Sequence, residues 1–126
     1  HHIANIGLHG GSMKGPGGNQ IPSYELFLGG SYQNGSSRIG ERVKTKVPAK
    51  RVPEAVKRIL DFYQSERSDG EEFNAFVDRQ GVKTFESLVL DLKDVGALGR
   101  DTIDLYMDWT KTVIYQVERG EGECAV

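Results

Sequence analysis

The sequence predicts an α+β fold in which a mixed or antiparallel sheet carries helices packed on one face. Up to about residue 50, apolar residues occur in short runs bounded by glycine and proline, which is typical of strands. Beyond that point they recur every three or four residues, the spacing of amphipathic helices. The chain has 126 residues, 37% of them hydrophobic, which suffices for one core, and we expect residues 1–126 to form a single domain.

Three strands are expected in the first half. Residues 3–8 and 23–28 are apolar runs separated by a glycine-rich segment, residues 10–19, which has the composition of a long hairpin loop. These two runs should pair as antiparallel neighbours. Residues 41–47 alternate basic positions with valine and threonine, the period-2 pattern of a half-exposed strand, and Pro48 should end it.

A helix should begin at Pro53, which suits the first helical position, and end near Asp69 and Gly70. Its apolar residues follow the spacing i, i+3, i+4 and i+7, so that they share one face. We expect this face to lie in the core and to consist of Val56, Ile59, Leu60 and Tyr63.

Further helices and a final strand are expected in the second half. Asp69 is suited to cap a short helix, and Gly81 to supply its exit; the apolar face of this helix is Phe73, Phe76 and Val77. Thr84 is suited to cap another helix, which should bury Phe85, Leu88, Val89 and Leu92. Residues 102–107 should form a helical turn and residues 112–118 a last strand.

Composition limits the possible functions. The formal net charge of −2 gives no general electrostatic case for binding nucleic acid or a membrane, and no apolar run approaches the length of about 18 residues that a spanning helix needs. One cysteine excludes an internal disulfide and a four-cysteine cluster built from this chain alone. The chain also opens without the hydrophobic region of a signal peptide, so we expect a cytoplasmic, reducing compartment.

Residues 1–30 carry the most informative motifs. Residues 3–8 read IANIGL and are followed by a glycine-rich turn, residues 24–30 read YELFLGG, and residues 38–40 read RIG. These motifs resemble the segment that directly follows the C-x3-C-G-Q or C-x3-C-G-R cluster motif in siroheme- and 4Fe-4S-dependent sulfite and nitrite reductases. The resemblance spans roughly residues 1–80 clearly and the tail GEGECA, residues 120–125, less specifically. The chain is thus similar to the C-terminal part of such a reductase.

The resemblance implies a parent oxidoreductase that reduces nitrite to ammonia or sulfite to sulfide with six electrons, using siroheme and a 4Fe-4S cluster. It implies two partners, a ferredoxin or other acidic electron donor and the missing N-terminal part of the same polypeptide. In this family the present segment would surround the cofactors, and catalytic residues and metal ligands would come from elsewhere. Its cofactor-side residues would be His1, His2, Gly29 and Gly30. We expect the chain alone to bind neither cofactor and to be inactive.

The histidines and glycines have competing interpretations. Adjacent histidines on an extended chain point to opposite sides and no fourth ligand occurs at zinc spacing, which argues against a metal site at His1, His2 and His9. His1 and His2 are either native residues that hydrogen-bond or pack near the cofactors, or the remnant of a purification tag. The glycine-rich segment does not fit a phosphate-binding loop, because a strand rather than a helix follows it.

Residues 38–51 form the single basic segment of the chain. Its basic residues are Arg38, Arg42, Lys44, Lys46, Lys50 and Arg51. Three interpretations remain open: an edge strand kept soluble by its charges, a docking face for an acidic electron donor, or a nucleic-acid contact. The docking interpretation involves Arg42, Lys44 and Lys46. Nucleic-acid binding is disfavoured because no aromatic residues interleave the charges.

Cys124 lies in an acidic tail. Glu118, Glu121 and Glu123 surround it in sequence, and nearby negative charge disfavours the thiolate, so a nucleophilic role is not expected. We expect residues 119–126 to form a flexible tail. The alternative to a reductase is a free-standing, ferredoxin-like α+β interaction or scaffold module without redox activity, because a fold does not establish a function.

Overall fold

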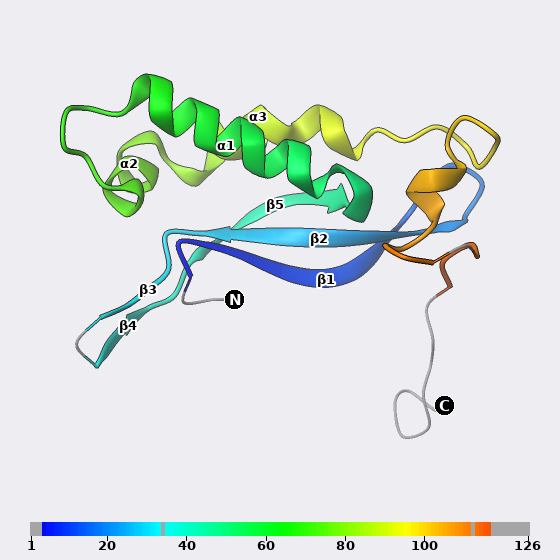
Figure 1. The fold of residues 1–126 in the computed structure, drawn as a ribbon, viewed down its shortest axis with the longest axis horizontal. Coiled ribbons are helices and arrows are strands. Elements are labelled where there is room, and N and C mark those ends of the chain that lie inside the picture. The colour runs from blue at the N-terminus through cyan, green and yellow to red at the C-terminus, as the bar shows by residue number, and fades with distance from the viewer. Residues whose placement is uncertain (1–3, 34, 112, 117–126) are drawn as a thin grey trace.

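The structure is a computed structural model that describes residues 4–33, 35–111 and 113–116. Its centre is an antiparallel sheet in the order β1-β2-β5, formed by Ile6–Lys14, Gln20–Leu28 and Glu41–Pro48. Three helices, α1 (Val52–Glu66), α2 (Phe73–Gln80) and α3 (Val82–Val89), lie together over one face of this sheet (Figure 1). The predicted α+β class is therefore confirmed.

The hairpin of β1 and β2 is longer than predicted. Its register pairs Ile6 with Leu28 and Lys14 with Gln20, so residues 10–14 belong to a strand and not to a loop. The turn is confined to residues 15–19, where Gly17 and Gly18 both have positive φ. The predicted loop was wrong because residues 10–14 pair in register with residues 20–24 of β2 despite their glycines; at Gly10 the ring of Tyr24 lies 3.5 Å from where a Cβ would be.

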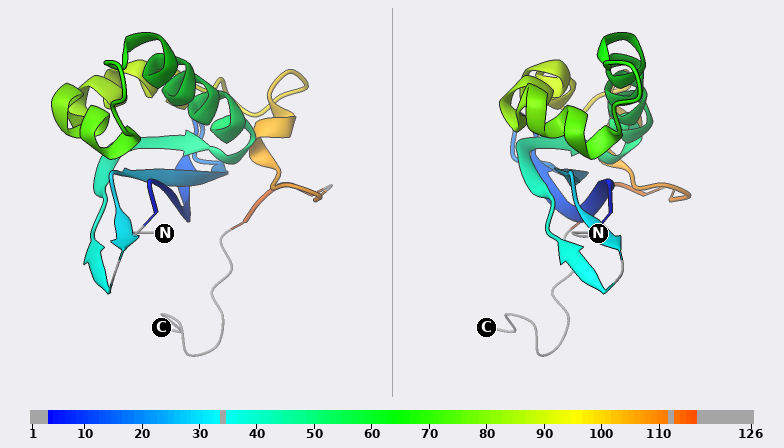
Figure 2. Two further views of the ribbon diagram at one scale, coloured as in Figure 1. Left: turned by 60° about the vertical axis from the view of Figure 1, so that its left-hand side comes forward. Right: turned by 90° about the vertical axis from the view of Figure 1, so that its left-hand side faces the viewer.

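A second, two-stranded ribbon was not predicted. It consists of β3 (Ser31–Gln33) and β4 (Ser36–Arg38) and extends away from the sheet and the helices (Figure 2). Its strands are short and polar, so they carry no alternating apolar pattern that a sequence could reveal. Arg38 forms an ion pair with Asp78, which ties the base of this ribbon to α2.

The main core lies between the sheet and the helices. Its strand contribution includes Leu26, Leu28, Val43 and Val47, and its helix contribution includes Ile59, Phe76, Phe85 and Val89. Thr45 is buried with the valines of β5, whereas all three basic side chains of that strand are exposed, as the alternation predicts. Phe62, Phe76 and Phe85 meet edge to face and join the three helices.

The predicted inner face of α1 was partly wrong. Ile59 is buried, with 1% exposed, but Leu60 is 46% exposed. The helix approaches the sheet through Ala55, and the buried stripe continues through Ile59 to Phe62. The inward face of α1 is therefore the one that carries Ala55 and Ile59, and Leu60 lies outside it.

The helix boundaries differ from the predicted caps. α1 begins at Val52, with Pro53 in its first turn. α2 begins after Glu72, so Asp69 does not cap it, and Gly81 ends α2 with φ of +83° as its predicted exit requires. α3 starts immediately after Gly81, and Thr84, inside α3, donates its hydroxyl to the carbonyl of Gln80 at 2.8 Å.

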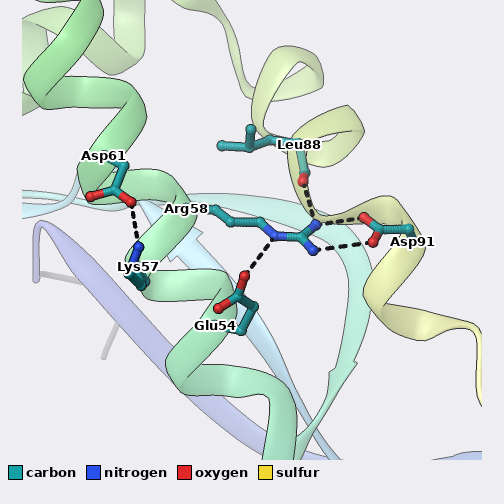
Figure 3. A network of polar contacts seen from close by, with 6 residues as sticks. All are labelled: Glu54, Lys57, Arg58, Asp61, Leu88 and Asp91. Atoms are coloured by element: carbon teal, nitrogen blue, oxygen red, sulfur yellow. Dashed lines mark hydrogen bonds and ion pairs between the residues drawn. The ribbon is translucent and has the colours of Figure 1, made fainter.

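Ion pairs fasten the helical layer. Arg58 on α1 donates to both carboxylate oxygens of Asp91 and to the carbonyl of Leu88, and its Nε contacts Glu54 at 3.3 Å (Figure 3). The hydrogen bond with Arg58 lowers the pKa of Asp91. α1 is thereby linked to the end of α3 and to the 3₁₀ turn η2 (Leu90–Lys93) that follows.

Glu71 anchors the connection between α1 and α2. Its carboxylate accepts hydrogen bonds from the guanidinium of Arg79 at 2.9 Å and from the amide of Ser68 at 3.0 Å. The hydrogen bond with Arg79, followed by the one with Ser68, lowers the pKa of Glu71 to about 2. The connection is therefore held by a carboxylate that is ionised at neutral pH.

The C-terminal part of the described chain packs at the end of the sheet where β1 turns into β2. The predicted helical turn is present as η3 (Ile103–Tyr106), and buried Tyr106 packs against Ile21 and Val95 in a second small core. Residues 113–116 form no strand, so the predicted strand at residues 112–118 was wrong over the described residues. The amide of Tyr115 instead donates to the carbonyl of Tyr106 at 2.6 Å, which folds this segment back on η3. Residues 117–126, including Cys124, lie outside the described residues.

Candidate functional site

Gly29 and Gly30 lie where β2 ends and the chain turns towards β3. Gly29 has φ of +87°, a conformation that other residues adopt only with strain. A Cβ at Gly29 would be in ordinary contact, 3.6 Å from both Arg38 and Val77. The backbone conformation, rather than lack of space within this chain, is therefore what requires glycine here.

Two asparagines hold the carbonyl of Gly30. Asn5 Nδ2 donates to this carbonyl at 3.2 Å and Asn74 Nδ2 donates to it at 3.1 Å. Asn5 Nδ2 also donates to Asn74 Oδ1 at 3.0 Å. We call Asn5, Gly30 and Asn74 the asparagine clamp. Because Asn5 precedes β1 and Asn74 lies on α2, the clamp fixes the start of β1 to the helical layer.

The clamp is extended by backbone and ionic contacts. The amide of Gly29 donates to the carbonyl of Asn5 at 3.0 Å, which continues the pairing of β1 with β2. Asp78, one helical turn after Asn74 on α2, forms the ion pair with Arg38, and this hydrogen bond raises the pKa of Arg38. Three separate segments thus converge on the glycine pair.

The predicted cofactor-side residues divide into two groups. Gly29 and Gly30 are at the clamp, whereas His1 and His2 lie outside the described residues. Within residues 4–33, 35–111 and 113–116, no three His, Cys, Asp or Glu side chains are grouped as a metal site would require. With one cysteine in the whole sequence, the residues of this chain do not fit the ligand set of a 4Fe-4S cluster.

Other residues of the sheet contact part of the basic face of β5. Arg42 pairs with Glu25 on β2 at 3.1 Å, and its side chain remains 55% exposed. Lys46 Nζ donates to the carbonyl of Ser12 on β1 at 3.0 Å. Lys44 is exposed, and its backbone amide donates to Glu86 at 3.1 Å. The three predicted docking residues are therefore all on β5 and exposed, but two of them also stabilise the sheet.

The asparagines of the clamp were missed from the sequence. Asn5 does lie inside the motif IANIGL, which was a usable signal. Asn74 is 69 residues away in sequence and stands in an ordinary helical pattern, so nothing local marks it. Only the packing of α2 beside the end of β2 brings the two together.

Comparison with known proteins relates the chain to sulfite reductases. No protein-family model matches it. It is 36% identical over 86 residues to the sulfite reductase (NADPH) hemoprotein beta-component of Shouchella clausii, which covers 68% of this chain and 13% of that protein. The corresponding protein of Staphylococcus carnosus is 36% identical over 59 residues, which covers 47% of this chain and 10% of that protein. The corresponding protein of Anoxybacillus flavithermus is 31% identical over 65 residues, which covers 52% of this chain and 11% of that protein.

A solved structure shares the fold. The Mycobacterium tuberculosis NirA protein matches with a TM-score of 0.60 and 24% sequence identity, over 66% of this chain and 15% of that chain. The sequence matches support a relationship to the sulfite reductases, and the solved structure shows the same fold. The chain spans about a tenth of the length of the curated relatives it matches. Within the described residues, no helix is long and apolar enough to cross a membrane.

Proposed function

We propose that this chain is a scaffold segment of a siroheme- and 4Fe-4S-dependent reductase that converts sulfite to sulfide or nitrite to ammonia. The observation that carries the proposal is the sequence similarity to sulfite reductase hemoproteins, which includes a match over 68% of the chain. The asparagine clamp supports it, because it fixes the start of β1, close to where the family places its cluster motif.

In this proposal the residues of the chain hold neighbouring segments in place. The clamp holds Asn5 and the beginning of β1 against α2, and Arg38 with Asp78 fastens the neighbouring ribbon to the same helix. Residues outside the ligand set that hold the ligands in place tune a metal site, and replacing them typically costs about 10–100-fold in metal affinity or activity. In this proposal the cluster ligands and the catalytic groups come from other parts of the longer polypeptide.

The test uses a longer polypeptide that contains this chain. Its coding sequence should show C-x3-C-G-Q or a close variant directly before His1, and the purified protein should show siroheme absorption and consume sulfite or nitrite with a chemical reductant. The 126-residue chain, reconstituted anaerobically with iron, sulfide and siroheme, is the control and should remain colourless. A longer polypeptide without the cysteine motif would refute the proposal and favour the scaffold module without redox activity.

We further propose that the exposed lysines of β5 help to dock an acidic electron donor such as a ferredoxin. Lys44 and Lys46 project from one strand of the sheet, and a local excess of positive charge accelerates encounter with an acidic protein. Arg42 contributes less, because Glu25 neutralises part of its charge.

Charge reversal tests the docking proposal. In the longer polypeptide, Lys44→Glu with Lys46→Glu should lower the donor-driven rate several-fold at low ionic strength. The difference should shrink as the Debye length falls from about 30 Å at 0.01 M salt to about 8 Å at 0.15 M. Lys83→Glu with Lys111→Glu, an equal charge change at other exposed positions, is the matched control. Equal losses in both double variants would show that net charge, not this strand, matters.

A further inference from the structure

A cleft lies between the turn that follows β1 and the segment that follows η2 (Figure 1). Its volume is about 550 Å³, within the range of small-molecule sites in proteins. One wall is formed by residues 14–16 and the other by residues 93–96, which are far apart in the sequence. The cleft is at the turn end of the β1-β2 hairpin, whereas the asparagine clamp is at the opposite end. It is therefore separate from the site described above.

Three charged side chains line the cleft. Lys14 and Lys93 come from opposite walls, and Asp94 lies beside Lys93. All three residues are exposed, and their side chains form no ion pair or hydrogen bond with another residue that the structure describes. By contrast, Lys57 and Arg58 on α1 each pair with a carboxylate. The cleft thus has an excess positive charge in a chain whose formal net charge is −2.

Arg51 fixes the wall that contains Lys93. Its Nη1 donates to the carbonyl of Leu92 at 2.9 Å and to the carbonyl of Asp94 at 2.8 Å, the two residues that flank Lys93. The backbone that bears the Lys93 and Asp94 side chains is therefore held in place within the chain itself. A wall that is already ordered loses less conformational entropy when a ligand binds.

The opposite wall is a hydrogen-bonded turn. The amide of Gly15 donates to the carbonyl of Asn19 at 2.9 Å, and the amide of Gly18 donates to the carbonyl of Gly15 at 3.1 Å. Gly15 also lies against the hydroxyl of buried Tyr106, which donates to the carbonyl of Gly96 on the other wall at 2.7 Å. Tyr106 thus joins the two walls beneath the cleft.

We propose that this cleft binds a phosphate monoester that also bears hydroxyl groups, such as a sugar phosphate or a nucleoside 5′-monophosphate. Lysine ammonium groups bind phosphate as point charges, and the two from Lys14 and Lys93 suit a group whose charge is close to −2 at neutral pH. The carboxylate of Asp94 only accepts hydrogen bonds, so it repels phosphate and receives the hydroxyl groups. Pro16 and Val95 offer apolar contact to the carbon atoms that lie between.

Titration of the 126-residue chain, followed by the NMR shifts of its backbone amides, tests the proposal. Ribose 5-phosphate should shift the amides of residues 14, 15 and 93–96 along one saturating curve. The dissociation constant should be on the order of 1 mM, because each exposed ion pair contributes little. Inorganic phosphate should bind more weakly, since it offers no carbon atoms and no sugar hydroxyls, and ribose should leave these amides unshifted. Shifts by ribose 5-phosphate that are still linear at about 10 mM would overturn the proposal.

Charge removal at the two lysines tests whether they act together. Lys14→Gln and Lys93→Gln should each weaken the binding of ribose 5-phosphate by at least about threefold, because each removes one ammonium group from the phosphate. Lys83→Gln and Lys111→Gln remove the same charge from exposed positions outside the cleft and are the matched controls. An equal loss in the controls would show that net charge, and not the cleft, attracts the phosphate, which contradicts the proposal.

Asp94→Ala tests the hydroxyl part of the ligand. This variant should bind inorganic phosphate more tightly, because a repelling charge is removed, and its preference for ribose 5-phosphate over inorganic phosphate should narrow. An unchanged preference would refute the assignment of Asp94 to the hydroxyl groups and, with it, the proposed ligand class. The titrations need no cofactor and no turnover, so their outcome is independent of the proposed reductase function.

Discussion

Replacing both asparagines of the clamp should destabilise the protein by more than the sum of the single replacements. Asn74→Ala and Asn5→Ala each remove one hydrogen bond to Gly30 and the bond that the two side chains share. An intramolecular hydrogen bond contributes about 0.5–1.5 kcal/mol, and the exposed bond between the two side chains counts at the lower end, about 0.5 kcal/mol. Each single variant should therefore lose about 1–2 kcal/mol of unfolding free energy. Each single variant still leaves one amide donating to the Gly30 carbonyl.

The double variant leaves this carbonyl without either side-chain donor. Gly30 is buried, and an unsatisfied buried acceptor costs about 1–3 kcal/mol. The bond between Asn5 and Asn74 is lost in both single variants, so adding the two single losses counts it twice, which overestimates the sum by about 0.5 kcal/mol. After this correction, the loss in the double variant should exceed the sum of the single losses by about 1 kcal/mol.

Urea unfolding followed by circular dichroism measures the three variants, with Gln64→Ala, an exposed amide on α1, as control. A double-variant loss equal to or smaller than the sum would show that solvent satisfies the carbonyl and that the clamp does not act as a unit.

Three further predictions concern the fold. Ile59→Ala should lower the unfolding free energy by about 2–5 kcal/mol and Leu60→Ala by about 1 kcal/mol or less, because only Ile59 is buried; similar losses would contradict the assigned face. Gly15→Ala should lower the unfolding free energy by about 1–3 kcal/mol in the same assay, because its Cβ would overlap the hydroxyl of Tyr106. Tyr106→Phe removes this hydroxyl, so it should lower the unfolding free energy less in the Gly15→Ala variant than in the unsubstituted protein. The pKa of Glu71, lowered from 4.5 to about 2, gives stability that is present above pH 4.5 and lost as pH falls towards 2. The melting temperature should therefore fall less between these pH values in Glu71→Gln than in the unsubstituted protein.

The parts of the fold that could be predicted are those with one strongly buried face. β5 alternates buried Val and Thr with exposed basic residues. When one face of a strand must be buried, such an alternation allows only one assignment of residues to the two faces. The end of β1 could not be predicted, because glycine lowers local strand propensity and the pairing with β2 that makes it a strand is a contact between distant residues. The same limit applies to Leu60: the apolar spacing fits two overlapping stripes on α1, and only the packed core shows that the buried one contains Ala55 and Ile59.

The candidate site was less predictable than the fold. Gly29 and Gly30 were identified through a resemblance, whereas the physical reason for Gly29 within this chain is its positive φ. The basic residues of β5 were correctly expected on an exposed face, but the partners Glu25 and Ser12 depend on sheet register and on reach across strands. Long-range polar contacts of this kind carry no local sequence signal.

Lys46 has two roles that can be separated. It belongs to the basic face of β5 and also donates to the carbonyl of Ser12 on β1, so Lys46→Glu removes a positive charge and a contact within the sheet. The side chain of Lys44 lies on the same strand without a described contact to β1. Lys44→Glu should therefore reduce the salt-sensitive donor rate and leave the urea midpoint unchanged, whereas Lys46→Glu should lower both. A lowered urea midpoint in Lys44→Glu would mean that its effect on the donor rate cannot be assigned to docking.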